Sequence, residues 1–452
     1  MFPRFGYFIS RQPVESVHPS TTHLDVHGRN LQGLEGAQYI VDTLERIPTI
    51  KHLILGNNSF GDNGVAALFQ YLTSERGTRL QIVEISLNSC DIGNLGLRAI
   101  CGYLNGNVRL KSLYLQNNEF NPSWALCSTF TSAINNSQLK TLSLTSNPHL
   151  GDTFLFRFLP NLSTPYLQEL HLSAMGLTSV STPHIVAFLS SDLPLPSSTS
   201  STEDDTPTIS LLKIDKYRPT TRLKDLRLNG NTFTLACAAS FVHALEHNNF
   251  SIRHLEMYAN RFYETTAAPP PPTQPSVAPP TPPSLTPTGL LARLAPQSDD
   301  MSWDDLKSKL SQIYARNHLL IYQTRIAALR LLSPARCLLL PPSRPSKSES
   351  RINGWNALPT ELQQYILATY SPALSPTQYI QIWNYVSDRR TLRRSGGVLS
   401  QLKPEQMAFS EGHGKDGAGK VPNDKDGWLE LVGCERFEWY KGWQQDFASI
   451  KW

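Results

Sequence analysis

This sequence of 452 residues lacks closely spaced cysteines and long apolar runs. Its six cysteines form no CxxC pair and no Cys/His cluster, so neither a disulfide framework nor a zinc site is indicated. No run approaches the roughly 20 apolar residues of a membrane helix, and the first residues lack the apolar stretch of a secretory leader. We therefore expect an intracellular protein of the cytoplasm or nucleus, without a membrane span. All six thiols are expected to be reduced core residues: Cys90, Cys101, Cys127, Cys237, Cys337 and Cys434.

A strong excess of one charge sign is also missing. Lys and Arg number 41 against 37 Asp and Glu, which leaves a net charge of +4. Nucleic-acid-binding domains are usually clearly basic, so we expect no nucleic-acid partner. The only basic block is residues 301–403, with 14 basic and 5 acidic residues. Its arginine cluster at 389–394 is more typical of a solvated helix end than of a nuclear import signal.

Proline is abundant and divides the chain. Ten of the nineteen positions from Pro269 to Pro287 are Pro, which predicts an extended linker at 269–288. A stretch rich in Ser, Thr and Pro at about 192–208 has little to bury and predicts a disordered insertion. The other predicted divisions are an N-terminal tail (1–20), a repeat region (21–268), a helical cap (289–340), a helical region (355–403) and a loop with an aromatic tail (404–452).

One pattern occurs eight times in the repeat region. Two apolar residues are separated by one residue; after two further residues comes a position that is usually Asn or Cys; and after one more residue comes another apolar residue. Successive copies are 29, 32, 28, 29, 28, 56 and 29 residues apart, and the Ser/Pro-rich insertion falls inside the gap of 56. Each copy predicts a short strand with its apolar side chains inward. The copies begin at Leu24, Leu53, Ile85, Leu113, Leu142, Leu170, Leu226 and Leu255.

The polar residue after each strand is expected to bond the turning backbone through its side chain. Asn occupies this position in five copies and Cys90 in another, whereas Arg29 and Met175 depart from the pattern. Between the strands the apolar period changes to 3.6 residues, as in the series Val65, Leu68, Phe69 and Leu72, and Ala37, Ile40, Val41 and Leu44. Each copy therefore predicts a strand, a turn and a helix.

Repeats of 28–29 residues with these leucines, asparagines and helices resemble the ribonuclease-inhibitor class of leucine-rich repeat proteins. The resemblance covers roughly residues 20–268 and implies an α/β leucine-rich repeat solenoid, a ribonuclease-inhibitor-like horseshoe with its strands on the concave face, here followed by a helical C-terminal region. The whole layout also resembles fungal leucine-rich repeat proteins with a helical C-terminal region. The resemblance implies no particular activity, because this scaffold hosts many different partners.

The strand residues that do not point inward are the candidates for contact with a partner. They mix charged, amide, hydroxyl and aromatic groups, which suits protein recognition. The candidate contact residues are Tyr114, Gln116, His171, Arg227, Asn229, Glu256 and Tyr258. A basic column, two positions upstream of the first apolar residue, is interpreted as the solvated edge of the repeats: Lys51, Lys111, Lys140, Lys224 and Arg253.

The region after the linker predicts helices from Trp303 to Leu340, interpreted as a cap over the last repeat. A further helix is expected to start in LPTELQQYILATY at 358–370. This segment resembles the opening of an F-box, which implies binding to the Skp1-type adaptor of a ubiquitin ligase. The matching residues are Leu358, Pro359, Glu361, Leu362, Ile366 and Leu367, with Trp383 as a later aromatic position.

No Ser/His/Asp or Cys/His arrangement can be argued from the spacing of these residues. We therefore expect a non-enzymatic scaffold that binds a protein partner on the concave strand face, without a metal or cofactor. Two alternatives stay open. One is an F-box-like substrate adaptor; the other is a Ran-type GTPase-activating protein, although the strongly acidic tail of that family is missing, since residues 404–452 hold 6 basic and 9 acidic residues.

Overall fold

The computed structural model describes residues 21–121, 123–190, 223–262, 301–339, 358–371, 373–388, 391 and 425–438. The predicted tail at 1–20, the insertion at 192–208, the linker at 269–288, the arginine cluster and most of 404–452 lie outside the described residues. The described residues belong to two compact units. The first runs through His184 and also contains Leu226–Thr232 and Glu256–Asn260, and the second holds the remainder.

Within the described residues, eight strands of three residues form one sheet. They are β1 (His23–Asp25), β2 (His52–Ile54), β3 (Glu84–Ser86), β4 (Ser112–Tyr114), β5 (Thr141–Ser143), β6 (Glu169–His171), β7 (Asp225–Arg227) and β8 (His254–Glu256).

Helices alternate with these strands and continue beyond them. They are α1 (Gly33–Arg46), α2 (Gly61–Thr73), α3 (Asn94–Leu104), α4 (Trp124–Asn135), α5 (Gly151–Phe158), α6 (Thr182–Leu189), α7 (Leu235–Asn248), α9 (Trp303–Leu339), α11 (Thr360–Tyr370), α12 (Pro376–Ser387) and α13 (Lys425–Leu431). Short 3-10 turns lie at Gly77–Arg79, Leu159–Asn161 and Ser179–Ser181.

The strands follow one another across the sheet in the order of the sequence. The pairs from β1 to β6 are parallel, and the first apolar residue of one copy lies opposite the first apolar residue of the next, as Leu113 does opposite Leu142. All eight of these residues are buried, and so is the second apolar residue of every copy. The predicted strands and their inward leucines are therefore confirmed.

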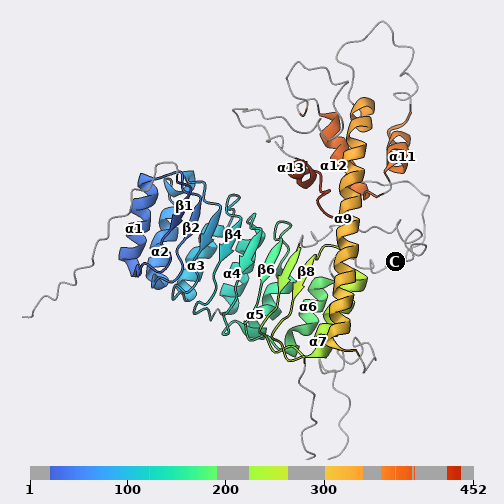
Figure 1. Cartoon of the computed structure of the whole chain (residues 1–452). Helices are drawn as coiled ribbons and strands as arrows, with labels where there is room; N and C mark the ends of the chain where they lie inside the picture. Colours follow the sequence, from blue (N-terminus) through green and yellow to red (C-terminus); the bar gives the residue numbers. More distant parts are fainter. Residues whose placement is uncertain are drawn as a thin grey trace, which may run out of the picture. The chain divides into compact units, whose positions relative to one another are not determined.

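The helices of the first unit lie along one side of the strands (Figure 1). Consecutive helices from α1 to α5 pack against one another. In α2 the predicted series Val65, Leu68, Phe69 and Leu72 is fully buried. In α1 the expected stripe is buried except for Val41, which is only half-buried.

In the five copies that have an asparagine after the strand, its side chain bonds the backbone as predicted. The Asn147 side-chain nitrogen donates to the carbonyl oxygens of Leu115, Leu144 and Thr145, at 3.0, 2.7 and 3.2 Å. Its side-chain oxygen accepts from the amide of Asn118 at 2.9 Å. Asn58, Asn118, Asn231 and Asn260 make similar bonds to their own copy and the preceding one.

The residue before each of these positions has a positive φ, between 51° and 65°, in every copy. This left-handed conformation costs an ordinary side chain roughly 1–2 kcal/mol, and only glycine adopts it freely. The residues that hold it are Gly28, Asn57, Ser89, Asn117, Ser146, Ala174, Gly230 and Ala259. The conformation turns the chain from strand to helix, and the asparagine amide then bonds the carbonyls that the turn exposes.

In the second unit, α9 is one continuous helix of 37 residues, although the sequence suggested several (Figure 1). Pro334 lies inside it. Its N-terminal half packs on α7, and its C-terminal half packs on α11 and α12. Its buried residues include Leu306, Leu310 and Ile313, which keep the predicted spacing.

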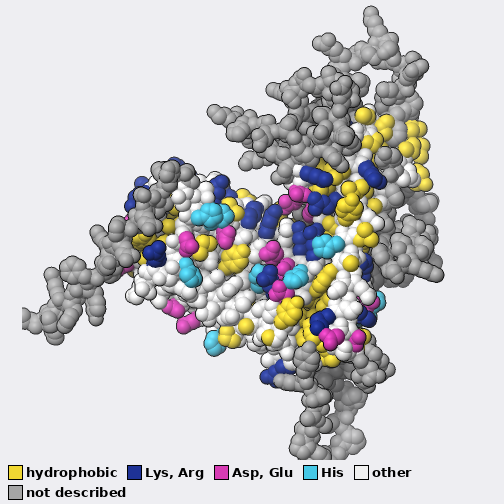
Figure 2. All heavy atoms as spheres, viewed as in Figure 1, with side chains coloured by type: hydrophobic (Ala, Val, Ile, Leu, Met, Phe, Trp, Pro, Cys, Tyr) yellow, Lys and Arg dark blue, Asp and Glu magenta, His cyan; other side chains and the backbone are white. Residues whose placement is uncertain are grey.

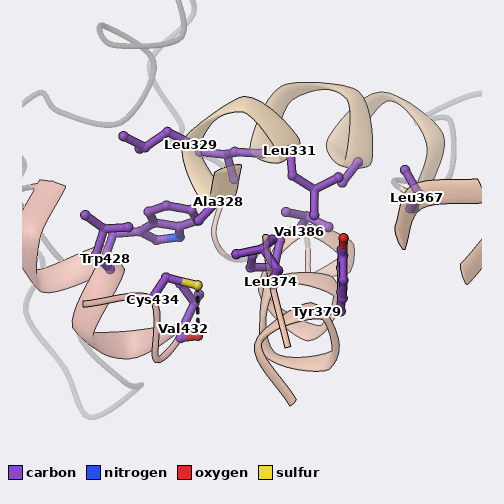
Figure 3. Packing of buried hydrophobic residues seen from close by; sticks show 14 residues of the cluster. Ala328, Leu329, Leu331, Leu367, Leu374, Tyr379, Val386, Trp428, Val432 and Cys434 are labelled. Atoms are coloured by element: carbon purple, nitrogen blue, oxygen red, sulfur yellow. Dashed lines mark hydrogen bonds between the residues drawn. The ribbon is translucent and has the colours of Figure 1, made fainter. Parts of the chain in front are cut away.

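A capping box starts α12. The Ser375 hydroxyl accepts from the Gln378 amide at 3.1 Å, and the Gln378 side-chain oxygen accepts from the Ser375 amide at 3.0 Å. The apolar sides of α9, α12 and α13 then close a core around Ala328, Ile382 and Trp428. Figure 3 shows this core, with the Cys434 thiol donating to the Val432 carbonyl at 3.5 Å.

All six cysteines are free thiols, and five are buried as expected. Cys337 is the exception: it is exposed, because it lies on the side of α9 opposite Ala335 and Leu332, which face the core. The prediction that all six occupy a core is therefore wrong for Cys337. Among the described helices, none combines the length and the low polarity that crossing a membrane requires.

Candidate functional site

The predicted strand-face residues follow the inward leucines by one or three positions. Tyr114, Ser143 and His171 lie in register on β4, β5 and β6. Successive side chains of a strand point to opposite faces, so these residues lie on the face opposite the buried leucines. Figure 2 shows acidic, basic and histidine side chains interspersed over the strands.

Hydrogen bonds connect the first part of this face. The Gln116 side-chain nitrogen donates to the Ser143 hydroxyl at 3.0 Å, and that hydroxyl donates to the Thr145 hydroxyl at 3.3 Å. The Gln116 amide donates to the Asn88 side-chain oxygen at 2.9 Å. The predicted residue Gln116 is thus held in place by the neighbouring copies on both sides.

Arg227, Asn229, Glu256 and Tyr258 form a second connected group. The Asn229 side-chain nitrogen donates to the Glu256 carboxylate at 2.6 Å, and the Arg227 Nε lies 3.9 Å from the other carboxylate oxygen. The Asn229 side-chain oxygen accepts from the Tyr258 amide at 2.8 Å. The Tyr258 side chain is 62% exposed. The structure therefore connects four of the seven predicted residues: two of them contact the Glu256 carboxylate, and Asn229 also bonds the backbone of the exposed Tyr258.

His171 differs from the expectation of an accessible contact residue. It is only 8% exposed, and its Nε2 lies 4.0 Å from the Glu169 carboxylate. Parallel strands lie about 4.8 Å apart, so the longer side chains of adjacent strands cover a ring on the central strand. His171 therefore contributes more to the packing of this face than to its accessible surface.

Tyr114 is influenced by charged side chains on the same strand face. Burial raises the pKa of its hydroxyl above the ordinary value, and the charges of Glu84 and Glu169 raise it further. A hydrogen bond with Ser112 and the charge of Arg227 act in the opposite direction. Tyr114 is thus a neutral donor and acceptor at physiological pH, in a part of the face that holds both signs of charge.

No protein-family model matches the chain, and neither does any curated protein.

One cluster of possible metal ligands was not predicted from the sequence. His243, Glu246 and His247 on α7 place one ligand atom each within 4.8 Å of one another. The signal was present in the sequence as the spacing i, i+3, i+4, which puts three side chains on one helix side. The His247 Nδ1 contacts the His243 carbonyl at 3.0 Å, and Lys309 Nζ lies 3.8 Å from the Glu246 carboxylate. The site is open to water and already has a cation beside its carboxylate, so it could hold a divalent cation only weakly.

The F-box-like residues lie at the start of α11 and on its exposed side. Leu362 and Ile366 are 49% and 44% exposed, whereas Leu367 is buried in the core formed with α9, α12 and α13. Pro359 is exposed, Leu358 is half-buried and Trp383 packs partly against the same core. The Glu361 side chain lies outside the described residues.

Proposed function

We propose that residues 21–268 form a leucine-rich repeat solenoid of the ribonuclease-inhibitor type, and that its concave strand face binds another protein without catalysing a reaction. The parallel strands in sequence order and the asparagine bonds between neighbouring copies support the repeat interpretation. The connected polar surface on the strands supports the binding role.

The group around Glu256 is the observation that carries this proposal. Asn229 holds the Glu256 carboxylate and the backbone amide of the exposed Tyr258, and Arg227 lies 3.9 Å from the same carboxylate. Tyrosine and arginine dominate the energetics of many protein interfaces, and a pre-ordered side chain loses less entropy when it binds. A partner with a complementary polar rim and a pocket for Tyr258 would fit this surface.

Photo-crosslinking of the full chain in its native extract would test the proposal. A benzophenone amino acid at position 258 should give one reproducible protein adduct, identified by mass spectrometry. The same group at Leu95, which is equally exposed at 63% but lies on α3, is the matched control and should not give that adduct.

The affinity of variants for the captured protein then distinguishes residues that contact it from residues that only lie nearby. The double change Arg227→Ser with Tyr258→Ser should weaken binding of the captured protein by at least about tenfold, since buried interface anchors contribute 2 kcal/mol or more. Leu95→Ser should leave it unchanged. Equal affinity of the double variant and the native chain would overturn the proposal.

A second candidate function is favoured by the exposed side of α11. Leu362, Tyr365 and Ile366 are all exposed on one short helix, while Leu367 anchors that helix to its core. Exposed apolar side chains gathered on one helix are typical of a partner-binding surface. We propose as the alternative that this side of α11 binds a Skp1-type adaptor, in the manner of an F-box.

Co-purification with a Skp1-type protein would test this alternative. Leu362→Asp should abolish the interaction, because it introduces a charge where an apolar contact is required. The matched control is Leu431→Asp on α13, where the leucine is 53% exposed. The absence of a stable complex with the native chain, or equal loss in both variants, would overturn the alternative. The Ran-type GTPase-activating role stays a prediction, and single-turnover GTP hydrolysis would test it.

A further inference from the structure

A pocket with a volume of about 270 Å³ lies against α9 in the second unit. Four basic side chains line it: Arg253, His318, Arg325 and Lys425. They come from three segments, since Arg253 directly precedes β8, His318 and Arg325 belong to α9, and Lys425 starts α13. Figure 2 shows basic and histidine side chains gathered beside α9.

One side of α9 supplies most of the pocket wall. His318, Tyr322 and Arg325 are separated by four and three residues, so they lie on the same side of the helix. Ile321, Ile326 and Leu329 add an apolar part to the wall. The pocket thus combines positive charge, a hydroxyl group and an apolar surface.

Arg253 is a half-buried cation in the wall of this pocket. Its Nε is buried and has no hydrogen-bond partner among the described residues, and its Nη2 reaches only the Glu435 carbonyl, at 3.5 Å. Burial lowers the pKa of Arg253, the charge of Arg325 lowers it further, and Glu435 offsets this only partly. A buried donor without an acceptor is costly, and an anion that accepts from it would remove that cost.

The charge of Arg325 is compensated by an exposed carboxylate. It forms an ion pair with Asp426, whose side chain is largely exposed. Exposed ion pairs contribute little and rearrange easily, so this pair leaves Arg325 able to turn toward a ligand. Arg253 was expected at a solvated edge of the repeats, but it is half-buried and lies near the guanidinium of Arg325.

We propose that this pocket binds a phosphate monoester whose organic part is apolar or aromatic. Two guanidinium groups and an ammonium group around one cavity match the several acceptor oxygens and the double charge of such a phosphate. Ile321, Ile326 and Leu329 would contact the organic part of the ligand. The assignment is independent of the strand face, because none of its residues belongs to the Glu256 group.

Calorimetric titration of the full chain tests the assignment with phenyl phosphate as the probe. Phenyl phosphate should bind at least about tenfold more tightly than inorganic phosphate, because it also covers the apolar wall, and more tightly than benzoate, which carries a single charge. Binding should weaken as salt is added. No detectable binding at millimolar probe, or equal binding of benzoate, would overturn the proposal.

The variants locate the site. Arg253→Gln should weaken the binding of phenyl phosphate by at least about tenfold, because a charge-assisted hydrogen bond is lost. If that variant does not fold, as judged by circular dichroism, Arg325→Gln provides the same test at a more exposed position. Arg330→Gln is the matched control, because Arg330 is an exposed residue of α9 that does not line the pocket. Unchanged binding in the folded pocket variants would overturn the proposal.

The phosphate monoester can belong to a phosphorylated protein or to a free small molecule, and a further titration distinguishes the two. A short phosphotyrosine peptide that binds more tightly than phenyl phosphate would identify a phosphorylated protein as the natural ligand. Weaker binding of the peptide would identify a free phosphorylated small molecule. Tyr258→Ser should leave both affinities unchanged, so that failure of the strand-face proposal would be seen separately.

Discussion

At the scale of single residues, the asparagines that follow the strands have the clearest role. One buried side chain satisfies three carbonyl groups and one amide, from its own copy and the preceding one. This role could be predicted, because asparagine recurs at one position and can both donate and accept. The left-handed residue before it could not be predicted, because that position holds Gly, Asn, Ser and Ala, which share no side-chain chemistry.

Replacing Asn147 by alanine should lower the free energy of unfolding by about 2–4 kcal/mol. The substitution leaves several buried backbone groups without their partner, and each such group costs about 1–3 kcal/mol, part of which water and relaxation recover. Urea unfolding followed by circular dichroism gives the value. Asn161→Ala is the control, because the exposed Asn161 side chain bonds only the Arg157 carbonyl, and its effect should stay below about 0.5 kcal/mol. Similar values for the two variants would contradict the assigned role.

Replacing Ala174 by glycine should raise the free energy of unfolding by up to about 1 kcal/mol. Ala174 has a φ of 51°, which glycine adopts without the steric cost that alanine carries. The greater entropy of glycine in the unfolded chain removes part of the gain. The helical Ala133→Gly should change stability in the opposite direction, by about 1 kcal/mol or more. Destabilisation by both changes in thermal unfolding would exclude the proposed strain at Ala174.

At the scale of elements, α9 has a contact that no periodicity could reveal. The Tyr314 hydroxyl accepts from the Leu255 amide at 2.8 Å and donates to the Leu255 carbonyl at 3.1 Å. The last strand of a sheet exposes backbone groups that have no further strand to pair with. Tyr314 replaces that missing partner, and the Asn317 side chain adds a bond to the Ile252 carbonyl at 2.7 Å.

Tyr314→Phe should therefore lower the free energy of unfolding by about 1–2 kcal/mol. The aromatic ring is retained, so the loss comes from the hydroxyl group alone. Amide hydrogen exchange at Leu255 should become faster by about tenfold. Tyr365→Phe removes an exposed hydroxyl on α11 and should change neither quantity. Unchanged exchange at Leu255 would show that the hydroxyl does not protect the strand edge.

At the scale of the whole molecule, the repeat spacing predicted the strands, while the pocket against α9 required the fold. The strands repeat every 28 or 29 residues in most copies, so their spacing in the sequence is enough to locate them. The pocket joins Arg253, Arg325 and Lys425, which lie 72 and 100 residues apart in the sequence and share no motif. The burial of His171 was also unpredictable, because it depends on side chains of adjacent strands.

The distribution of thiols predicts the chemical reactivity of the folded chain. Only Cys337 is exposed, whereas burial raises the pKa of Cys90 and of Cys101 to about 12. The thiolate is the reactive form. Iodoacetamide at pH 8 should therefore add one group to the native chain, at Cys337, and six to the unfolded chain, as intact mass would show. Rapid addition of further groups to the native chain would contradict the burial of the other five.

The same shifts make part of the stability depend on alkaline pH. The folded state holds the protons of Cys90 and Cys101 more tightly than the unfolded state, whose thiols have a pKa near 8.5. The stability linked to them is thus present below about pH 8.5 and is lost as the pH rises toward 12.

The asparagine bonds also bear on how such a chain can change during evolution. Asn231 reaches the Leu172 carbonyl across 59 residues in the same way that Asn147 reaches Leu115 across 32. The asparagine hydrogen bond between neighbouring copies therefore does not depend on the length of chain that connects them. Segments inserted between copies, or whole duplicated copies, would leave these asparagine bonds intact. An insertion between a strand and its asparagine would instead move the side chain away from the carbonyls that it bonds.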